Sequence, residues 1–421
     1  MVNDKSAFGL FSAAASPLLA LVNPFRPFLA AVLLGGLSLL PTVSAADRPL
    51  REVLDAALAQ SADQYRFMLK QLGDERAIPR TFEHGKLFKP HLDRDWTVGF
   101  FPGSLWYLYE ATGDAAWRAS AERYTDYVAS WAGNKGTHDV GFVLYCSYGN
   151  GLRLTKNAAY ADILRAGAAT LAGRFSPTVG AIKSWDWGAR KGWDFPVIID
   201  NMMNLELLFW AADSDPRLRE IAVKHADTTL AHHFRADDSS FHVVDYDAKT
   251  GAVRNRVTHQ GTADSSAWAR GQGWGLYGYT FMYRFTKEAR YLARAQRIAE
   301  FILNHPRLPA DKIPYWDFDA PGIPNAPRDS SAGALIASAL IELADYVDAP
   351  TAARYRAVAE TQIRALCSDA YLAKPGENAG FLLKHATGNL PSNSEIDVPL
   401  NYADYYFLEA VLRARAKLAA K

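Results

Sequence analysis

The chain has a helical pattern of hydrophobic positions along almost its whole length. From Leu50 onward, apolar residues recur at intervals of three and four, and the first such face consists of Val53, Ala57, Ala62, Tyr65, Met68 and Leu69. The alternation that is typical of strands is rare, and we expect only a short ribbon from Phe241–Tyr246 and Ala252–Val257. The pattern therefore predicts an all-α protein.

Six helices in this pattern share one plan, in which polar or glycine-containing residues precede a helix of small, aliphatic and aromatic residues. They begin near Trp96, Asp139, Asp200, Ser266, Ser330 and Tyr402. The spacing of roughly 60 residues leaves room for a second amphipathic helix in each repeat, such as Pro216–Phe234 or Glu288–His305. Two arrangements fit six helical hairpins: a closed ring and an open solenoid.

In a closed ring, the polar helix starts would meet at one mouth. Inner helices of such a ring are apolar on most faces and carry small residues where neighbours crowd, as in Ser330–Leu340 and Arg270–Gly278. Free N–H groups and positive dipole ends at that mouth favour an anionic ligand. The carboxylates of Asp139 and Asp200 would stand in the same mouth.

The composition fits a globular protein with a sizeable core. Of the 421 residues, 49% are hydrophobic and 22% are charged. The net charge of +1 gives no electrostatic reason to expect binding to nucleic acid. The 11 Trp and 20 Tyr residues suit core packing, and those near helix starts also suit stacking on sugar rings.

The N-terminus has the features of an export signal. An apolar run, Pro27–Pro41, follows Arg26 and precedes Val43-Ser44-Ala45. We expect residues 1–45 to be a signal peptide cleaved after Ala45, and residues 46–421 to form a single catalytic domain in the periplasm or outside the cell. The alternatives are a retained membrane anchor and a disordered tail.

The two cysteines, Cys146 and Cys367, leave two interpretations open. An exported protein could pair them in a disulfide, but Cys146 lies in an apolar helical stretch that favours a buried free thiol. No Cys/His cluster has the spacing of metal ligands, so we expect no metal site.

Two aspartates stand in similar surroundings, where a loop runs into an apolar helix. Asp139 lies in His138-Asp139-Val140-Gly141-Phe142, and Asp200 lies in Ile198–Asn204. Two carboxylates at matching places in apolar surroundings suggest acid/base chemistry on one substrate. The simpler interpretation is helix capping, for which Asp is a favoured residue.

Several motifs in this order resemble glycoside hydrolase family 88, the unsaturated glucuronyl hydrolases. They are HDVGF, IIDNMMNL, THQG followed by SAWARGQGW, and YADYYFLEA, and the resemblance runs from about Asp93 to Leu418. It implies an (α/α)6 barrel of six helical hairpins, in agreement with the closed ring. The resemblance also implies an enzyme that removes the 4,5-unsaturated uronic acid left by a polysaccharide lyase at the non-reducing end of an oligosaccharide.

The implied reaction begins with hydration of the enol-ether double bond. By resemblance, Asp200 protonates C4 and activates the attacking water. Asp139 is the second carboxylate, which positions substrate hydroxyls or raises the pKa of Asp200 by like-charge proximity. An acid and water suffice for this chemistry, so no cofactor is expected.

The resemblance also indicates residues that contact the substrate. Arg270 is the candidate for the substrate carboxylate, although it could instead pair with a buried acid. His242, Thr258 and Gln260 match polar ligand-contacting positions, although His242 alone would be an unremarkable strand histidine. Trp274 and Trp185 could stack on sugar rings or belong to the core, and Trp96 is a further candidate platform.

A loop near the C-terminus, His385–Ser394, adds one more candidate contact, Ser392. In family members that accept sulfated glycosaminoglycans, the sequence of this loop resembles Ser-x-x-Ser-x-Lys, whereas this chain has Asn389-x-x-Ser392-x-Ser394. The missing lysine argues against a preference for 6-sulfated substrates. Glu395, Asp397 and Asp404 are expected to have structural roles.

Three other functions remain open from the sequence. One is an unsaturated rhamnogalacturonyl hydrolase, which shares the barrel, and another is a catalytically inactive oligosaccharide-binding protein. The third is a helical scaffold, which predicts a large exposed apolar groove. The expected partner is an unsaturated oligosaccharide, and we expect a monomer or a weak homodimer.

Overall fold

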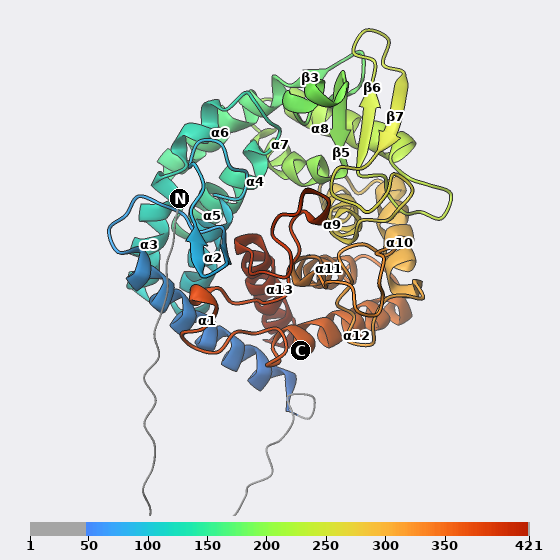
Figure 1. Ribbon diagram of the computed structural model, residues 1–421. Helices are drawn as coiled ribbons and strands as arrows, with labels where there is room; N and C mark the ends of the chain where they lie inside the picture. Colours follow the sequence, from blue (N-terminus) through green and yellow to red (C-terminus); the bar gives the residue numbers. More distant parts are fainter. Residues whose placement is uncertain (1–47, 420–421) are drawn as a thin grey trace, which may run out of the picture. The chain divides into compact units, whose positions relative to one another are not determined.

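The computed structural model describes residues 48–419, and the predicted signal segment, residues 1–45, lies outside this range. Outer and inner helices alternate along the chain (Figure 1). The outer helices are α1 (Leu50–Leu72), α3 (Ala115–Asp126), α6 (Ala158–Ala172), α8 (Arg217–His232), α10 (Ala289–Asn304) and α12 (Ala349–Leu366). Their inner partners are α2 (Phe100–Thr112), the segment α4 (Val140–Leu144), η2 (Tyr145–Gly149) and α5 (Asn150–Thr155), then α7 (Leu205–Ala211), α9 (Ala269–Thr286), α11 (Ser330–Leu343) and α13 (Asn401–Ala419).

The ring of inner helices is closed by its first and last members. Helix α13 packs against both α11 and α2, and the outer helix α1 packs against α12 and α13. This closure confirms the predicted all-α (α/α)6 barrel and excludes the open solenoid. The predicted inner-helix starts agree with the structure to within a few residues.

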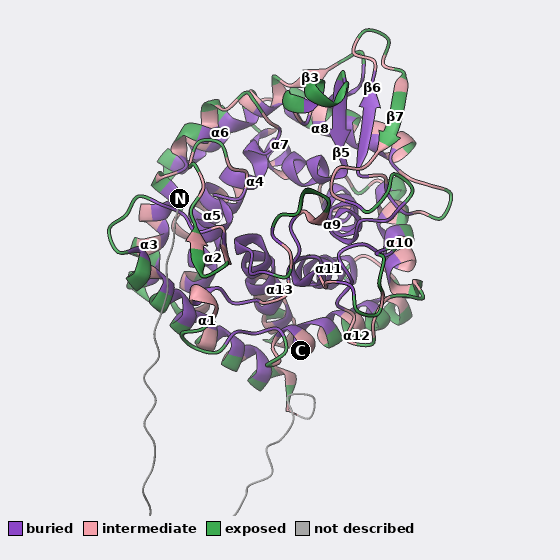
Figure 2. Ribbon diagram, in the orientation of Figure 1, coloured by how far each residue is buried: buried purple, intermediate pink, exposed green. Residues whose placement is uncertain are grey.

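Burial explains why the two kinds of helix differ in composition. Every residue of α11 is buried, whereas α10 buries only Tyr291, Ala295, Ile298, Ala299 and Ile302, a single stripe (Figure 2). Crowding among the inner helices requires small residues: a Cβ on Gly273 in α9 would lie 2.8 Å from Leu335 of α11. The inner helices can therefore pack closely around the barrel axis.

Short strands lie in the connections between helices. The strands β5 (Phe195–Ile198), β6 (Val243–Tyr246) and β7 (Val253–Val257) form an antiparallel sheet in that order, which confirms the expected ribbon. We did not anticipate β5, because all four of its residues are buried and show no alternation. Two smaller hairpins pair β1 (Thr81–Glu83) with β2 (Lys86–Phe88) and β3 (Phe175–Ser176) with β4 (Ala181–Ile182).

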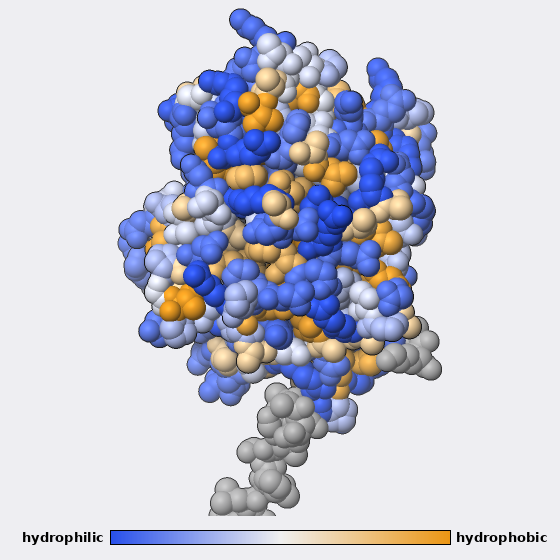
Figure 3. All heavy atoms as spheres, turned by 90° about the vertical axis from the view of Figure 1, so that its right-hand side faces the viewer, coloured by the Kyte–Doolittle hydropathy of each residue, from blue (hydrophilic) through white to orange (hydrophobic). Residues whose placement is uncertain are grey.

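The face that carries α10 and β7 is mainly hydrophilic, and its hydrophobic residues are scattered (Figure 3). This face therefore lacks the broad apolar groove that a helical scaffold would need. Cys146 and Cys367 are both free, and Cys146 is buried as the apolar pattern favours. Between residues 48 and 419, no helix combines the length and the apolar composition needed to cross a membrane.

Candidate active site

The two aspartates lie at the starts of neighbouring inner helices. Asp139 immediately precedes α4, and Asp200 lies in the short 3₁₀ turn η4 (Ile199–Asn204) that leads into α7. The two starts are joined by a hydrogen bond of 2.8 Å from the Phe142 backbone N–H to Asn204 Oδ1. A Cβ on Gly141 would lie 2.6 Å from the Cα of Asn204, so only glycine allows this approach. The aspartates are thus held on one rigid support.

Asp200 has the environment expected of an acid that keeps its proton near neutral pH. Burial raises its pKa to about 7; His138 and Arg270 oppose the shift, and the Asp139 carboxylate adds a smaller increase. Oδ2 of Asp200 is buried and accepts no hydrogen bond within residues 48–419. Asp139 raises the pKa of Asp200, which is one of the two roles predicted for it, but burial is the main cause of the shift.

His242 presents a hydrogen to Asp200. Its Nδ1 accepts hydrogen bonds of 3.1 Å from the backbone N–H groups of His259 and Gln260, so the proton of the neutral ring is on Nε2. Burial holds the pKa of His242 well below its usual range, so the ring is neutral. Nε2 lies 3.8 Å from Asp200 Oδ2, which is too far for a direct hydrogen bond.

Asp139 is held by its immediate neighbours. Its Oδ1 lies 3.2 Å from Nε2 of the buried His138, and its Oδ2 accepts a hydrogen bond from the Thr137 hydroxyl. The side chain of Asp139 makes no capping hydrogen bond to α4. Helix capping, the simpler interpretation, therefore does not explain this carboxylate.

Both aspartates line a pocket of about 430 Å³ at the mouth where the inner helices begin. We call it the active-site pocket; Trp96, Trp185 and Gln260 also line it. The Trp185 indole is half-buried and stacks on Trp187, with ring centroids 4.5 Å apart. The pocket therefore brings together five of the ten predicted residues, the two aspartates with Trp96, Trp185 and Gln260.

Sequence reasoning missed several lining residues, most of which come from loops distant in the chain. They are Arg80, Asp93, Arg94, Asn134, Gly136, Thr137, Trp187, Ile198, His259 and Asn389. His259 and Ile198 lie within the motifs THQG and IIDNMMNL, and Thr137 adjoins HDVGF; this was the one available signal. The others occupy loops in which no periodic pattern marks a side chain as pocket-facing.

Arg270 is a buried ion-pair partner rather than a free cation. It is 1% exposed, and its Nη1 lies 2.7 Å from Asp329 Oδ2 and 2.7 Å from the carbonyl oxygen of Thr387. Nη2 donates to the Gly388 carbonyl at 2.7 Å. The alternative of a buried acid partner is therefore the one observed, and Arg270 fixes the C-terminal loop beside the pocket. Its charge still acts on Asp200 electrostatically.

Three further predicted contacts lie outside the pocket wall. Trp274 is 0% exposed and packs against Phe142 and Tyr406, so its assignment as a stacking platform is wrong: helix α9 is buried on all sides there. The hydroxyl of Thr258 accepts the Gly261 N–H at 2.8 Å and shapes the turn that carries Gln260. Ser392 is exposed on the loop whose Asn389 lines the pocket.

The three acids with expected structural roles are engaged in local contacts. Glu395 pairs with Arg80 at 2.6 Å, and His385 pairs with Asp397 at 2.6 Å. Asp404 accepts the Leu382 and Leu383 N–H groups at 3.0 Å each. Within residues 48–419, no three His, Cys, Asp or Glu side chains are arranged to hold a metal ion.

A carboxylate pair in a polar, tryptophan-lined pocket at the mouth of the barrel is suited to acid/base chemistry on a sugar, as in a glycosidase. No protein-family model matches the chain. The chain is 49% identical over 323 residues to an unsaturated glucuronyl hydrolase of Formosa agariphila, a match that covers 76% of this chain and 80% of the relative. It is 35% identical over 360 residues to the unsaturated glucuronyl hydrolase of Bacillus sp. strain GL1, and this match covers 82% of this chain and 92% of the relative.

A crystal structure of an unsaturated glucuronyl hydrolase specific for heparin has a TM-score of 0.84 and 49% identity, covering 88% of this chain and 98% of that one. The chain belongs to the unsaturated glucuronyl hydrolases, glycosidases of glycoside hydrolase family 88. The rhamnogalacturonyl alternative and the inactive binding protein are not favoured.

Proposed function

We propose that this glycosidase removes the 4,5-unsaturated uronic acid from lyase-generated oligosaccharides with Asp200 as its proton donor. The observation that carries the assignment is a buried carboxyl group in the pocket, with a pKa of about 7 and with Oδ2 free of hydrogen bonds from the described residues, 48–419. A general acid is most effective when its pKa lies near the working pH. Asp139, which accepts a hydrogen bond from the Thr137 hydroxyl and lies 3.2 Å from His138 Nε2, is suited to position a substrate hydroxyl.

The reaction follows from the chemistry of a vinyl ether. The Asp200 carboxyl group transfers its proton to C4, and the double-bond electrons form the new C–H bond. The resulting oxocarbenium ion at C5 is captured by water, which loses a proton to the Asp200 carboxylate. Asp200 is then protonated again. The hemiketal opens by breaking the C5–O5 bond, which gives a ketone at C5 and a hemiacetal at C1. The hemiacetal becomes an aldehyde as the C1–O bond to the leaving sugar breaks, and its hydroxyl proton passes to the leaving oxygen. His242 Nε2–H, 3.8 Å away, is placed to stabilise the carboxylate between these steps.

The rate should depend on pH through Asp200. Because the acid must be protonated, kcat/KM is expected to fall about tenfold per pH unit above about 7, the pKa that burial gives Asp200. Initial rates from pH 5 to pH 9 on an unsaturated disaccharide test this. A rate that keeps rising through pH 9 would show that the proton donor is a different group.

Trp185 is expected to bind the substrate without taking part in the chemistry. Its indole lines the pocket, and an aromatic face packs against the C–H face of a sugar. Trp185→Ala should raise KM roughly 3- to 10-fold and leave kcat within about twofold, whereas Trp185→Phe should retain most of the affinity. An unchanged KM in Trp185→Ala would remove Trp185 from the substrate site.

The substrate source and the location of the enzyme are also proposals. The relative of 49% identity that is specific for heparin makes heparin lyase products the first substrates to test. Because Asn389 lines the pocket and no lysine ends the Ser392–Ser394 segment, we expect no preference for 6-sulfated disaccharides. We expect a periplasmic or secreted protein, a monomer or weak homodimer; cell fractionation and light scattering test these expectations.

A further inference from the structure

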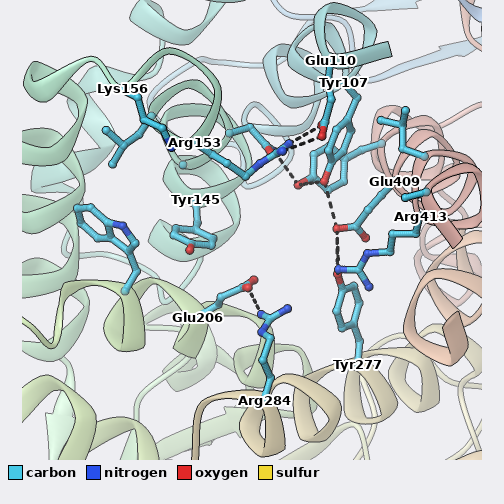
Figure 4. A pocket seen from close by; sticks show the side chains of 17 residues that line it. Tyr107, Glu110, Tyr145, Arg153, Lys156, Glu206, Tyr277, Arg284, Glu409 and Arg413 are labelled. Carbon is cyan, nitrogen blue, oxygen red and sulfur yellow. Dashed lines mark hydrogen bonds and ion pairs between the residues drawn. The ribbon is translucent and has the colours of Figure 1, made fainter. Parts of the chain in front are cut away.

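A second and larger pocket lies at the opposite end of the barrel from the aspartates. Its volume is about 720 Å³, and it is lined by residues from the later parts of the inner helices, including Tyr107 of α2, Trp210 of α7 and Tyr277 of α9 (Figure 4). We call it the lower pocket. Its size is that of a small-molecule site, and none of its lining residues takes part in the proposed hydrolysis.

Most of the charges in the lower pocket are paired with one another. Arg153 contacts Glu110 at 2.5 Å, and Arg284 contacts Glu206 (Figure 4). Arg413 contacts Glu409 at 3.4 Å, and Glu342 joins Arg284 and Arg413 from behind at 3.1 Å each. These pairs brace the helix ends, and they also present guanidinium and carboxylate groups side by side on the pocket walls.

Two polar groups remain without partners on the other side of the lower pocket. Within residues 48–419, the ammonium group of the exposed Lys156 makes no ion pair or hydrogen bond, and the hydroxyl of the half-buried Tyr145 makes no hydrogen bond. Both residues line the cavity and lie across it from Glu409 and Arg413 (Figure 4). A cation and a hydroxyl that face paired charges across a cavity are suited to an acidic, hydroxyl-rich ligand.

The backbone around Tyr145 has an unusual shape. Residues Tyr145–Gly149 form a π-helical turn between α4 and α5, and such turns are frequent at functional sites. A Cβ on Gly149 would lie 3.0 Å from the Tyr145 ring, so the glycine leaves room for the ring at the pocket wall. Tyr145 is the first residue of this turn and lines the lower pocket.

We propose that the lower pocket binds a second molecule of acidic sugar, a uronate. Its carboxylate would meet Lys156, its hydroxyls would donate to the glutamates and accept from the arginines, and its C–H face would contact Trp210 or Tyr145. The choice of a uronate rests on the proposed function, which places uronate saccharides and their products around this enzyme. A product or an intact oligosaccharide end would supply the same chemistry.

Calorimetric titration with sodium glucuronate tests the proposal without any need for turnover. Wild-type protein is expected to show a binding event that Lys156→Gln weakens about tenfold and that Trp185→Ala, in the active-site pocket, leaves unchanged. Lys287→Gln is a matched control, because Lys156 and Lys287 both end an inner helix with φ of 58° and only Lys156 lines the pocket. Neutral glucose should bind this site about tenfold more weakly than glucuronate.

Each outcome of the titration either supports or overturns uronate binding in the lower pocket. Glucuronate density in the lower pocket of a soaked crystal, together with weaker binding by Lys156→Gln, would support the site. Comparing the affinity of the lower pocket for glucuronate with its affinity for an unsaturated disaccharide would show whether it binds product or substrate. Equal affinity in wild type, Lys156→Gln and Lys287→Gln, or density confined to the active-site pocket, would overturn it. A failure to hydrolyse any unsaturated saccharide would refute the proposed function but would not alter this binding result.

Discussion

Asp200→Asn is expected to lower kcat by roughly 10³-fold on an unsaturated disaccharide. The amide keeps the shape of the side chain but cannot donate a proton to C4 or accept one from water. Because Asp200 is buried within the rigid η4 turn, the fold should be unchanged. Steady-state rates with matched circular dichroism spectra provide the measurement.

The same substitution should stabilise the protein at alkaline pH. Asp200 has a folded-state pKa of about 7, above the unfolded value of about 4, so its contribution to stability is fully present below about pH 4 and is lost as the pH rises through about 7. Asp200→Asn removes this loss, so its melting temperature should exceed that of the wild type at pH 8.

An Asp200→Asn protein that keeps more than about a tenth of the activity would refute the proton-donor assignment.

Arg270→Leu is expected to destabilise the fold by about 3–5 kcal/mol. The substitution leaves the fully buried Asp329 carboxylate without its counter-charge and removes the donor for the carbonyl groups of Thr387 and Gly388. Urea unfolding followed by tryptophan fluorescence measures the loss. Since Gly388 adjoins Asn389 in the pocket wall, KM should also rise.

A double-mutant cycle separates the ion pair from its surroundings. Asp329→Asn retains an oxygen that can still cap α11 at Ser331, so it mainly removes the negative charge. The protein with both Arg270→Leu and Asp329→Asn should lose less stability than the sum of the two single losses. A loss below about 1 kcal/mol in Arg270→Leu alone would show that the pair contributes little.

The helices and their order could be predicted from the sequence because burial gives outer helices a periodic apolar stripe and inner helices a continuous run of small and apolar residues. The stripe on α10 and the apolar run of α11 already distinguish outer from inner helices. Ring closure could not be predicted, because it depends on contacts between α2 and α13, which lie about 300 residues apart along the chain. Family resemblance supplied that part of the fold.

Residues of the candidate site could be predicted from the sequence where a side chain capable of acid/base chemistry stands at the start of an inner helix. Asp139 and Asp200 stand at such starts, and both line the pocket. Trp274 was misassigned because four-residue spacing from Arg270 puts both on one helical face without showing whether that face meets the mouth or the core. Arg80 and Asn389 were missed because only the folded chain brings their loops together.

The most direct test of the account is the ultraviolet absorbance of the conjugated double bond, followed together with release of the leaving saccharide. We predict that wild-type protein removes the absorbance of an unsaturated disaccharide in step with saccharide release, and that Asp200→Asn leaves both unchanged. Unchanged absorbance with folded wild-type protein across heparin, chondroitin and other lyase products would contradict hydration of the double bond as the activity of this chain.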